Sequence, residues 1–274
     1  MKRPISSILP ADSERAAPSS GTQSLGRALD LLRLISTRNR EGVRLQQAVA
    51  ASGMSKTTVF RLLRELRASG LVAQDEARRY HLGQFALELG LVAAGAFNHR
   101  DLCSESMRRL AEETGDTVLL VTRSGLDSFF LDCKVGGFPV RMEPVEIGYR
   151  QPLGVGPGGL AYLSYLPSDE REAITLANGP RLGAYQGMTV ERVFDQITRT
   201  LSRGYAYLED FYRPDLAGIG IPVLDPAGRP CVSISVSSVR QRMTDSHRES
   251  VLVALRRETA RMRAALFGPS HSAH

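Results

Sequence analysis

Near the start of the chain, apolar residues recur every three to four positions. In residues 24–36, SLGRALDLLRLIS, they form the stripe of an amphipathic helix. The stripe consists of Leu25, Ala28, Leu29, Leu32 and Ile35. Ser24 is a good candidate for the N-cap, and Gly42 interrupts the pattern. The segment therefore predicts a first helix that starts after Ser24.

A helix, a turn and a second helix follow. Residues 45–51 predict a short helix, Gly53 a tight turn, and Ser55 the N-cap of a helix of roughly fourteen residues. One face of that second helix is apolar and the opposite face is polar. The apolar face consists of Val59, Leu62, Leu63 and Leu66; the polar face consists of Thr57, Arg61 and Arg64, flanked by Lys56, Thr58 and Phe60. This arrangement is typical of a helix-turn-helix unit.

A hairpin comes next. The segments LVAQ and RYHL read as short strands around a turn at Asp75-Glu76, which makes a winged variant of the unit. Such a domain places the N-terminal residues of its second helix in the DNA major groove, where hydroxyls and cations suit phosphates and base edges. The candidate DNA-binding residues are Arg44, Ser55, Lys56, Thr57, Thr58, Arg61, Arg64, Arg78 and Arg79. The alternative is a solvated surface helix beside a hairpin with incidental arginines.

The charge distribution supports a polyanionic partner. The net charge is +6, and residues 22–85 carry all of it, with eleven basic and five acidic residues. Residues 86–274 have 21 basic and 22 acidic residues and are close to neutral. Positive charge confined to one part of a chain favours nucleic acid as the ligand of that part.

The rest of the chain predicts a helix and then a mixed domain. Residues 84–97, QFALELGLVAAGAF, predict an apolar helix that packs at a subunit or domain interface, or in a core. Helices are then expected at 101–115, 157–166, 168–177, 189–203 and 245–267, and strands within 116–125, 127–137, 138–148, 205–210, 217–225 and 231–238. Helices gathered around a mainly antiparallel sheet make an α+β domain.

Several classes of protein are disfavoured. No apolar run approaches the roughly 18 residues of a membrane span, and the N-terminus has no signal-peptide core, so we expect a cytoplasmic protein. Cys103, Cys133 and Cys231 are widely spaced, and none of the five histidines has metal-ligand spacing. No G-x-S-x-G elbow appears. We therefore expect no catalytic residues, no metal site and no cofactor.

One glycine-rich stretch has the spacing of a dinucleotide-binding loop. Gly154, Gly156 and Gly159 match G-x-G-x-x-G, but no strand directly precedes them and no carboxylate follows about 20 residues later. Pro157 also removes a backbone N–H. A turn that presents helix N-terminal N–H groups to a small carboxylate fits better, with a purely structural turn as the alternative.

These residues resemble a known family. The segments SLGRALDLLRLI, GMSKTTVFRLLRELRASGLV and RRYHLG are similar to the winged helix-turn-helix of the IclR family of bacterial transcriptional regulators, and the resemblance continues to about residue 266. It implies a GAF-like effector-binding domain, and a homodimer or dimer of dimers on a double-stranded DNA operator. We expect a small organic acid, in particular a carboxylic acid, to modulate that binding. The expected division is a disordered tail at 1–21, the winged domain at 22–83, a linker helix at 84–99 and the effector-binding domain at 100–268.

The resemblance also implies where the effector binds. The candidate effector-binding residues are the positions that match the family's pocket together with the loop glycines: Gly154, Gly156, Pro157, Gly158, Leu208, Gly218, Ser235 and Ser237. The loop departs from the common family pattern PLHATxxGKA, because Gly154, Gly156 and Leu160 replace His, Thr and Lys, and Ala217-Gly218 replaces Arg-Cys. Ser235 and Ser237 alternate on one strand and face the same side, where they could bind a carboxylate or satisfy local backbone.

Overall fold

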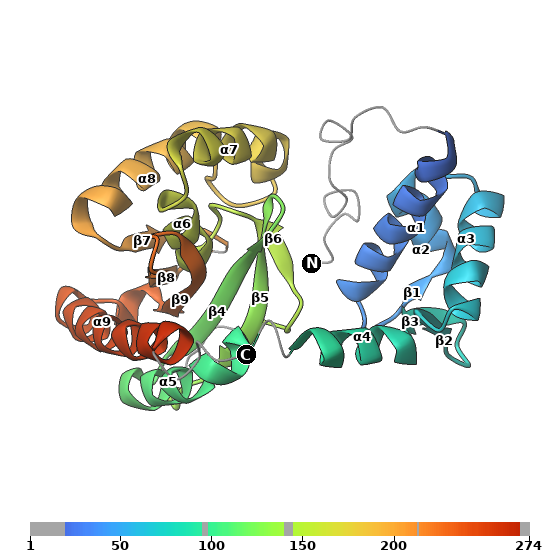
Figure 1. The fold of residues 1–274 in the computed structure, drawn as a ribbon. Helices are drawn as coiled ribbons and strands as arrows, with labels where there is room; N and C mark the ends of the chain where they lie inside the picture. Colours follow the sequence, from blue (N-terminus) through green and yellow to red (C-terminus); the bar gives the residue numbers. More distant parts are fainter. Residues whose placement is uncertain (1–19, 95–97, 140–144, 213, 269–274) are drawn as a thin grey trace. The chain divides into compact units, whose positions relative to one another are not determined.

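The chain folds as two units that divide between residues 97 and 98. The computed structural model describes residues 20–94, 98–139, 145–212 and 214–268 (Figure 1). Of the disordered tail predicted at residues 1–21, residues 1–19 lie outside these ranges, and residues 20–21 belong to the first helix instead. Each unit has its own hydrophobic core and is described by itself.

The first unit is a helix-turn-helix followed by a hairpin. Its elements are α1 (Ser20–Ser36), β1 (Val43–Arg44), α2 (Leu45–Ser52), α3 (Lys56–Ala68), β2 (Val72–Gln74), β3 (Arg79–Leu82) and α4 (Gln84–Ala94). The three strands form an antiparallel sheet in the order β1-β3-β2. The predicted hairpin is confirmed, as β2 and β3.

The turn between α2 and α3 has the predicted chemistry. Gly53 adopts the left-handed conformation (φ 65°) and donates its N–H to the carbonyl of Val49. The side chain of Ser55 accepts the N–H of Thr58, which confirms Ser55 as the N-cap of α3. The apolar face of α3 is buried against Leu31, Leu34 and Ile35 of α1; it consists of Val59, Leu62, Leu63 and Leu66.

Two details of this unit differ from the sequence-based predictions. The described part of α1 already begins at Ser20, so Ser24 lies inside the helix and its prediction as the N-cap is wrong. The nearest proline before the helix is Pro18, and residues 22–24 form no sequence signal strong enough to stop a helix. Strand β1 was not predicted because two residues are too few to show alternation.

The second unit is a six-stranded antiparallel sheet with helices on both faces. Its elements are α5 (His99–Thr114), β4 (Thr117–Ser124), β5 (Asp127–Lys134), β6 (Arg150–Pro152), α6 (Pro157–Ser164), α7 (Ser168–Leu182), α8 (Val190–Arg203), β7 (Ala206–Glu209), β8 (Leu216–Leu224), β9 (Pro230–Val239), a 3₁₀ turn at Arg240–Arg242 and α9 (Asp245–Phe267). The strand order is β6-β5-β4-β9-β8-β7. Helices α5 and α9 lie together on one face, and α6, α7 and α8 on the other (Figure 1).

The two faces of strand β9 explain this packing. Val232, Ile234 and Val236 belong to the core beneath α5 and α9. The alternate positions 233, 235 and 237 are buried serines on the α6 side. On neighbouring β8, a Cβ atom added to Gly220 would lie 2.3 Å from the carbonyl oxygen of Pro157. The small residues on this face therefore let the backbone of α6 approach the backbone of the sheet.

Two further predictions for this unit need correction. The predicted strand at 138–148 is not observed in its described residues, 138–139 and 145–148, while residues 140–144 lie outside the description; the sixth strand is instead β6. Helix α7 extends to Leu182, past the predicted end at 177, although it contains Pro180. Tertiary contacts hold this last turn, since the buried Asn178 side chain donates to the carbonyl of Leu126 at 2.8 Å.

Strand β7 forms one edge of the sheet, and arginines of α8 bind its carbonyls. Arg203 donates to the carbonyl oxygens of Tyr205 (2.8 Å) and Tyr207 (3.0 Å). Arg192 donates to the carbonyl of Glu209 at 2.9 Å. Side chains of the preceding helix thus occupy two carbonyls of this strand and that of Tyr205, the residue before it.

Helices α5 and α9 are joined through a buried carboxylate. The side chain of Glu258 has no exposed surface, and its oxygens lie 2.9 Å from Arg109 Nη2 and 2.6 Å from Arg261 Nη1. Arg257 is a third partner, at 3.1 Å. Burial alone would raise the pKa of Glu258, but hydrogen bonds from Arg109 and Arg257 outweigh it and hold that pKa below its usual value.

We predict that Glu258→Gln destabilises the chain at pH 7 by about 1–3 kcal/mol, less than for a fully buried pair because the arginines reach solvent. The carboxyl has a lower pKa in the folded than in the unfolded chain. Its contribution is therefore present above the unfolded pKa of about 4.3 and is lost as pH falls through the folded pKa. Urea unfolding of wild type and variant, followed by circular dichroism from pH 7 to below pH 4, should show the difference shrinking in acid.

The matched control is Glu249→Gln, which changes an exposed residue of the same helix and should have little effect at any pH. A difference between wild type and Glu258→Gln that stays constant with pH would show that this carboxylate does not contribute through its charge.

Candidate nucleic-acid interface and ligand site

The outer face of α3 carries most of the predicted DNA-binding side chains. Lys56, Thr57, Arg61 and Arg64 are all exposed there, opposite the buried apolar face. Arg64 Nη2 lies 3.0 Å from Glu65 Oε1, in an exposed ion pair that water competes with. Among the described residues, Arg61 has no hydrogen bond or ion pair. The cationic face is thus available to a polyanion.

Ser55 and Thr58, at the start of α3, also take part in capping the helix. Ser55 Oγ and Thr58 Oγ1 lie 2.9 Å apart, and the same Ser55 oxygen accepts the Thr58 N–H at 3.2 Å. Both hydroxyls are therefore used in capping the helix. Lys56 and Thr57 remain as the side chains of this first turn that point to solvent without a capping role.

The two wing arginines differ in their surroundings. Arg78 is exposed at the tip of the hairpin, in the left-handed region at φ 58°. Arg79 is half-buried, and its Nη1 donates to the carbonyl of Glu41 at 2.9 Å. The N–H of Arg79 donates to Asp75 Oδ1 at 2.7 Å, which lowers the pKa of that carboxyl. Arg79 thus stabilises the wing, whereas Arg78 extends outward.

Arg44 lies at the junction of β1 and α2. Its side chain is exposed, and its backbone N–H donates to Gln47 Oε1 at 2.8 Å, which closes the first turn of α2. The nine predicted residues thus lie on β1, on α3 with its N-cap, and on the wing of one small domain. Those on α3 form a continuous exposed face.

In the second unit, a row of four residues crosses the sheet beneath α6. Thr117 of β4 pairs with Ser237 of β9, Ser237 with Gly218 of β8, and Gly218 with Leu208 of β7. A Cβ atom on Gly218 would lie 2.6 Å from Ser237 Oγ and 2.9 Å from Pro157 Cγ. Gly218 therefore leaves room for the serine hydroxyl beside the start of α6.

Two hydroxyls in this row are buried without a partner. Thr117 and Ser237 are each 1% exposed, and neither Thr117 Oγ1 nor Ser237 Oγ has a hydrogen bond in the described part of the protein. A buried hydroxyl without a partner costs free energy, so such groups call for an explanation. A polar ligand that accepts from both oxygens would remove that cost.

Most of the predicted ligand residues gather around this row. Gly158 follows Pro157, and a Cβ atom on it would lie 3.0 Å from Val121 Cγ2 and 3.1 Å from Ser235 Oγ. This glycine thus faces the sheet at close range. Pro157, Gly158, Leu208, Gly218, Ser235 and Ser237, predicted from distant parts of the sequence, lie at the contact of α6 with the sheet.

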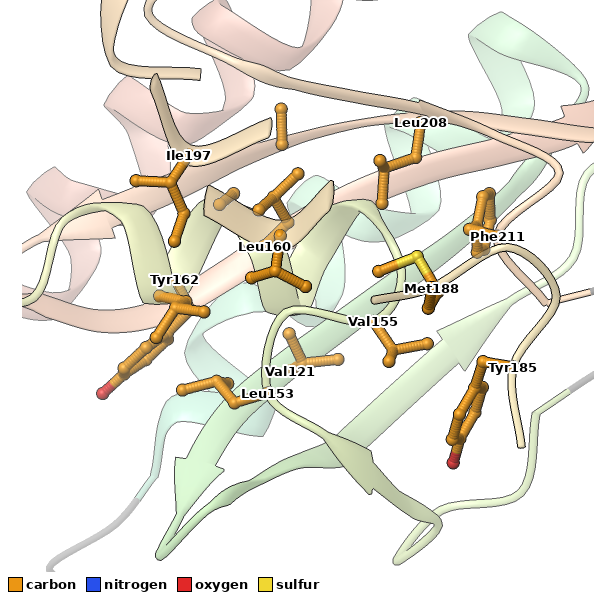
Figure 2. Close-up of a cluster of buried hydrophobic side chains, with 14 of the residues drawn as sticks. Val121, Leu153, Val155, Leu160, Tyr162, Tyr185, Met188, Ile197, Leu208 and Phe211 are labelled. Atoms are coloured by element: carbon orange, nitrogen blue, oxygen red, sulfur yellow. The ribbon is translucent and has the colours of Figure 1, made fainter. Parts of the chain in front are cut away.

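The first two glycines of the loop lie elsewhere. Gly154 (φ 102°) faces Leu163 and Val193. Both belong to the apolar core that also contains Leu160, Val155 and Phe211 (Figure 2). Gly156 (φ 77°) caps α6 and lies against Gln151 and the ring of Phe211. Both are left-handed positions that favour glycine, as a structural turn requires, and their predicted role in effector binding stays a prediction. Residues 151–164 are all buried.

Sequence reasoning missed Thr117 and Gly220. Thr117 is defined by its cross-strand neighbour Ser237, on a strand more than a hundred residues away in the chain, and Gly220 by the nearby backbone of Pro157. No local pattern marks a threonine as the partner of a particular serine. The only available signal was that buried strands with glycine and serine at alternate positions must face a closely packed backbone.

The described residues give little support for a metal site, a reactive thiol or a membrane span. They contain no group of three or more His, Cys, Asp or Glu side chains placed to hold a metal ion. Burial raises the pKa of the Cys103 thiol to about 12 and that of Cys231 to about 11, so both thiols are protonated at neutral pH. None of the helices described here is both long enough and apolar enough to span a membrane.

Comparison with known proteins agrees with this architecture. The profile described as "Bacterial transcriptional regulator IclR C-terminal" matches residues 94–263, and the profile described as "IclR helix-turn-helix domain" matches residues 24–76. The HTH-type transcriptional regulator KipR of Bacillus subtilis (strain 168) is 27% identical over 208 residues, which cover 76% of this chain and 83% of KipR.

Solved structures share the fold. A putative IclR transcriptional regulator from Silicibacter sp. TM1040 aligns with a TM-score of 0.78 at 24% identity, covering 89% of this chain and 96% of the other. An IclR homolog from Microbacterium hydrocarbonoxydans, complexed with 4-hydroxybenzoate, aligns with a TM-score of 0.72 at 17% identity, covering 89% and 98%.

The predicted fold class, a winged helix-turn-helix followed by a GAF-like α+β domain, is confirmed. The prediction that the chain is not an enzyme is confirmed too, because its relatives are transcriptional regulators. The two matched profiles and the two units of the structure lead to one conclusion: this chain is a DNA-binding transcriptional regulator of the IclR family.

Proposed function

We propose that this regulator binds a specific operator in double-stranded DNA through α3 and the wing, and that a small organic acid bound beneath α6 modulates the binding. The observation that carries the second part is the pair of buried, unpartnered hydroxyls of Thr117 and Ser237. Binding of 4-hydroxybenzoate by a structural relative supports a carboxylic acid as the class of effector.

The chemistry of the row suits a carboxylate. Two hydroxyls on paired strands can donate to the two oxygens of one carboxylate group. The first turn of α6 adds backbone N–H groups that have no intrahelical acceptor, and the helix dipole favours negative charge there. Leu208 and Pro157 supply apolar contacts beside the hydroxyls. A small acid with a compact hydrophobic body fits this combination.

We also propose that the chain acts in the cytoplasm, with its DNA, as a homodimer or dimer of dimers. The support is α4, the predicted linker helix, whose apolar residues are exposed on opposite sides. Leu87 and Leu91, on one side, are 63% and 66% exposed, and Leu89, about half a turn away, is 49% exposed. A helix that is apolar all round is normally buried, and a second copy of the chain would cover it.

Arg61→Ala should weaken operator binding by about 1–3 kcal/mol and relax the preference for one base pair, because arginine can bind guanine through two hydrogen bonds. Fluorescence anisotropy with operator duplexes altered at single positions measures both effects. Equal weakening on all sequences would instead place Arg61 on a phosphate, and unchanged affinity would remove it from the interface.

Ser237→Ala should weaken acid binding by about 10–100-fold, the range expected for a lost hydrogen bond to a charged group. It should leave folding stability unchanged or higher, because the deleted hydroxyl has no partner. The acid is first found by a thermal-shift screen of small carboxylic acids that includes 4-hydroxybenzoate, and calorimetry then gives its affinity.

The control is Ser233→Ala on the same face of β9. Ser233 Oγ donates to the carbonyl of Ile221 at 3.1 Å, so this variant should lose about 1 kcal/mol of stability and keep its affinity for the acid. A screen in which no acid binds, or a Ser237→Ala variant with full affinity, would contradict the proposed site.

Leu91→Asp should lower the oligomeric state or weaken self-association, because it places a charge on the apolar surface of α4. Light scattering coupled to size-exclusion chromatography, over a range of protein concentrations, measures the mass. The control is Leu176→Asp, which changes a residue of α7 that is 54% exposed. A wild-type monomer at micromolar concentration with full operator affinity would overturn the oligomer proposal.

A further inference from the structure

Phe60 is a large apolar side chain on the polar side of α3. It is 53% exposed, whereas Val59 and Leu63 of the same helix are fully buried. At 100° per residue, Phe60 lies about 110° from the centre of the buried face, in line with Lys56 and Arg64, which are one turn away on either side. The ring is therefore not part of the apolar stripe that holds α3 in the domain.

The surroundings of the ring indicate what can cover it. Lys56 and Arg64 flank it along the helix, and Arg61 is its neighbour in sequence. Such a surface has one exposed ring and several cations. It is complementary to a groove that is lined by phosphates and has an apolar group at its base. The major groove of DNA has that character where thymine exposes its C5-methyl group.

We propose that Phe60 reads a thymine methyl group in the operator. The inference rests on the proposed function, because it requires α3 to enter the major groove. Lys56 and Arg64 would contact the phosphates, and the ring would pack on one methyl. A ring cannot hydrogen-bond to a base edge, so Phe60 would recognise thymine through contact area alone and would distinguish it from cytosine by the missing methyl.

The test removes that methyl without changing base pairing. An operator is first selected from random-sequence duplex DNA with the wild-type chain, and each thymine in it is then replaced singly by deoxyuridine. For wild type, we expect one replacement to weaken binding by about four-fold, which corresponds to ~0.8 kcal/mol for one buried methyl-sized group. Phe60→Ala should bind the thymine and deoxyuridine duplexes equally well at that position.

A second duplex tests the methyl independently of thymine. At the sensitive position, a cytosine–guanine pair should bind wild type less well, and 5-methylcytosine should recover part of the loss. Phe60→Leu, which keeps an apolar side chain, should retain part of the methyl preference. Circular dichroism and thermal melting of Phe60→Ala should match wild type, because the ring is outside the core.

Two results would overturn the inference: wild-type binding that is insensitive to every deoxyuridine replacement, or a Phe60→Ala variant that is as sensitive as wild type. A loss of self-association in Phe60→Ala would overturn it as well, by placing the ring at a subunit contact. Arg61→Ala distinguishes a failure of this inference from a failure of the proposed function. If Arg61 is needed and no methyl is sensed, only the role of Phe60 fails; if no duplex is selected, or Arg61 has no effect on binding, the proposed docking of α3 fails.

Discussion

The close approach of α6 to the sheet governs the architecture of the second unit. A Cβ atom on Gly220 would lie 2.3 Å from a backbone oxygen of Pro157, a distance that no real side chain tolerates. The strands beneath α6 can therefore carry only small residues where the helix begins. Serine and glycine meet this requirement, and serine brings a hydroxyl with it. The polar row of the candidate ligand site thus follows from the same constraint that seats the helix.

The sequence was most informative where the determinants are local. The cap at Ser55, the turn at Gly53 and the buried stripe of α3 each depend on residues no more than seven positions apart, and each was predicted correctly. The predicted end of α7 was wrong. Pro180 disfavours the last helical turn, but the hydrogen bond from Asn178 to the distant carbonyl of Leu126 stabilises it.

The same difference between local and distant determinants applies to the candidate ligand site. Periodicity places Ser235 and Ser237 on one side of β9, but it cannot show that Ser237 lies opposite Thr117, because strand pairing over this separation leaves no mark in the sequence. The loop glycines show the converse. Their spacing suggested a shared role in binding, which stays a prediction; the structure shows that Gly154 has a left-handed backbone and lies close to Leu163. Spacing identifies a turn more readily than it identifies what the turn faces.

The arginines of α8 have a consequence for how this regulator can assemble. An edge strand normally offers a free row of carbonyls to any extended segment that approaches it. Along β7 that row is occupied at Tyr207 by Arg203 and at Glu209 by Arg192, and Arg203 also holds the carbonyl of Tyr205 just before the strand. An incoming strand would have to displace charged donors before forming its own ladder. Continuation of the sheet from one molecule to the next is thereby opposed at this edge, and so is aggregation through it.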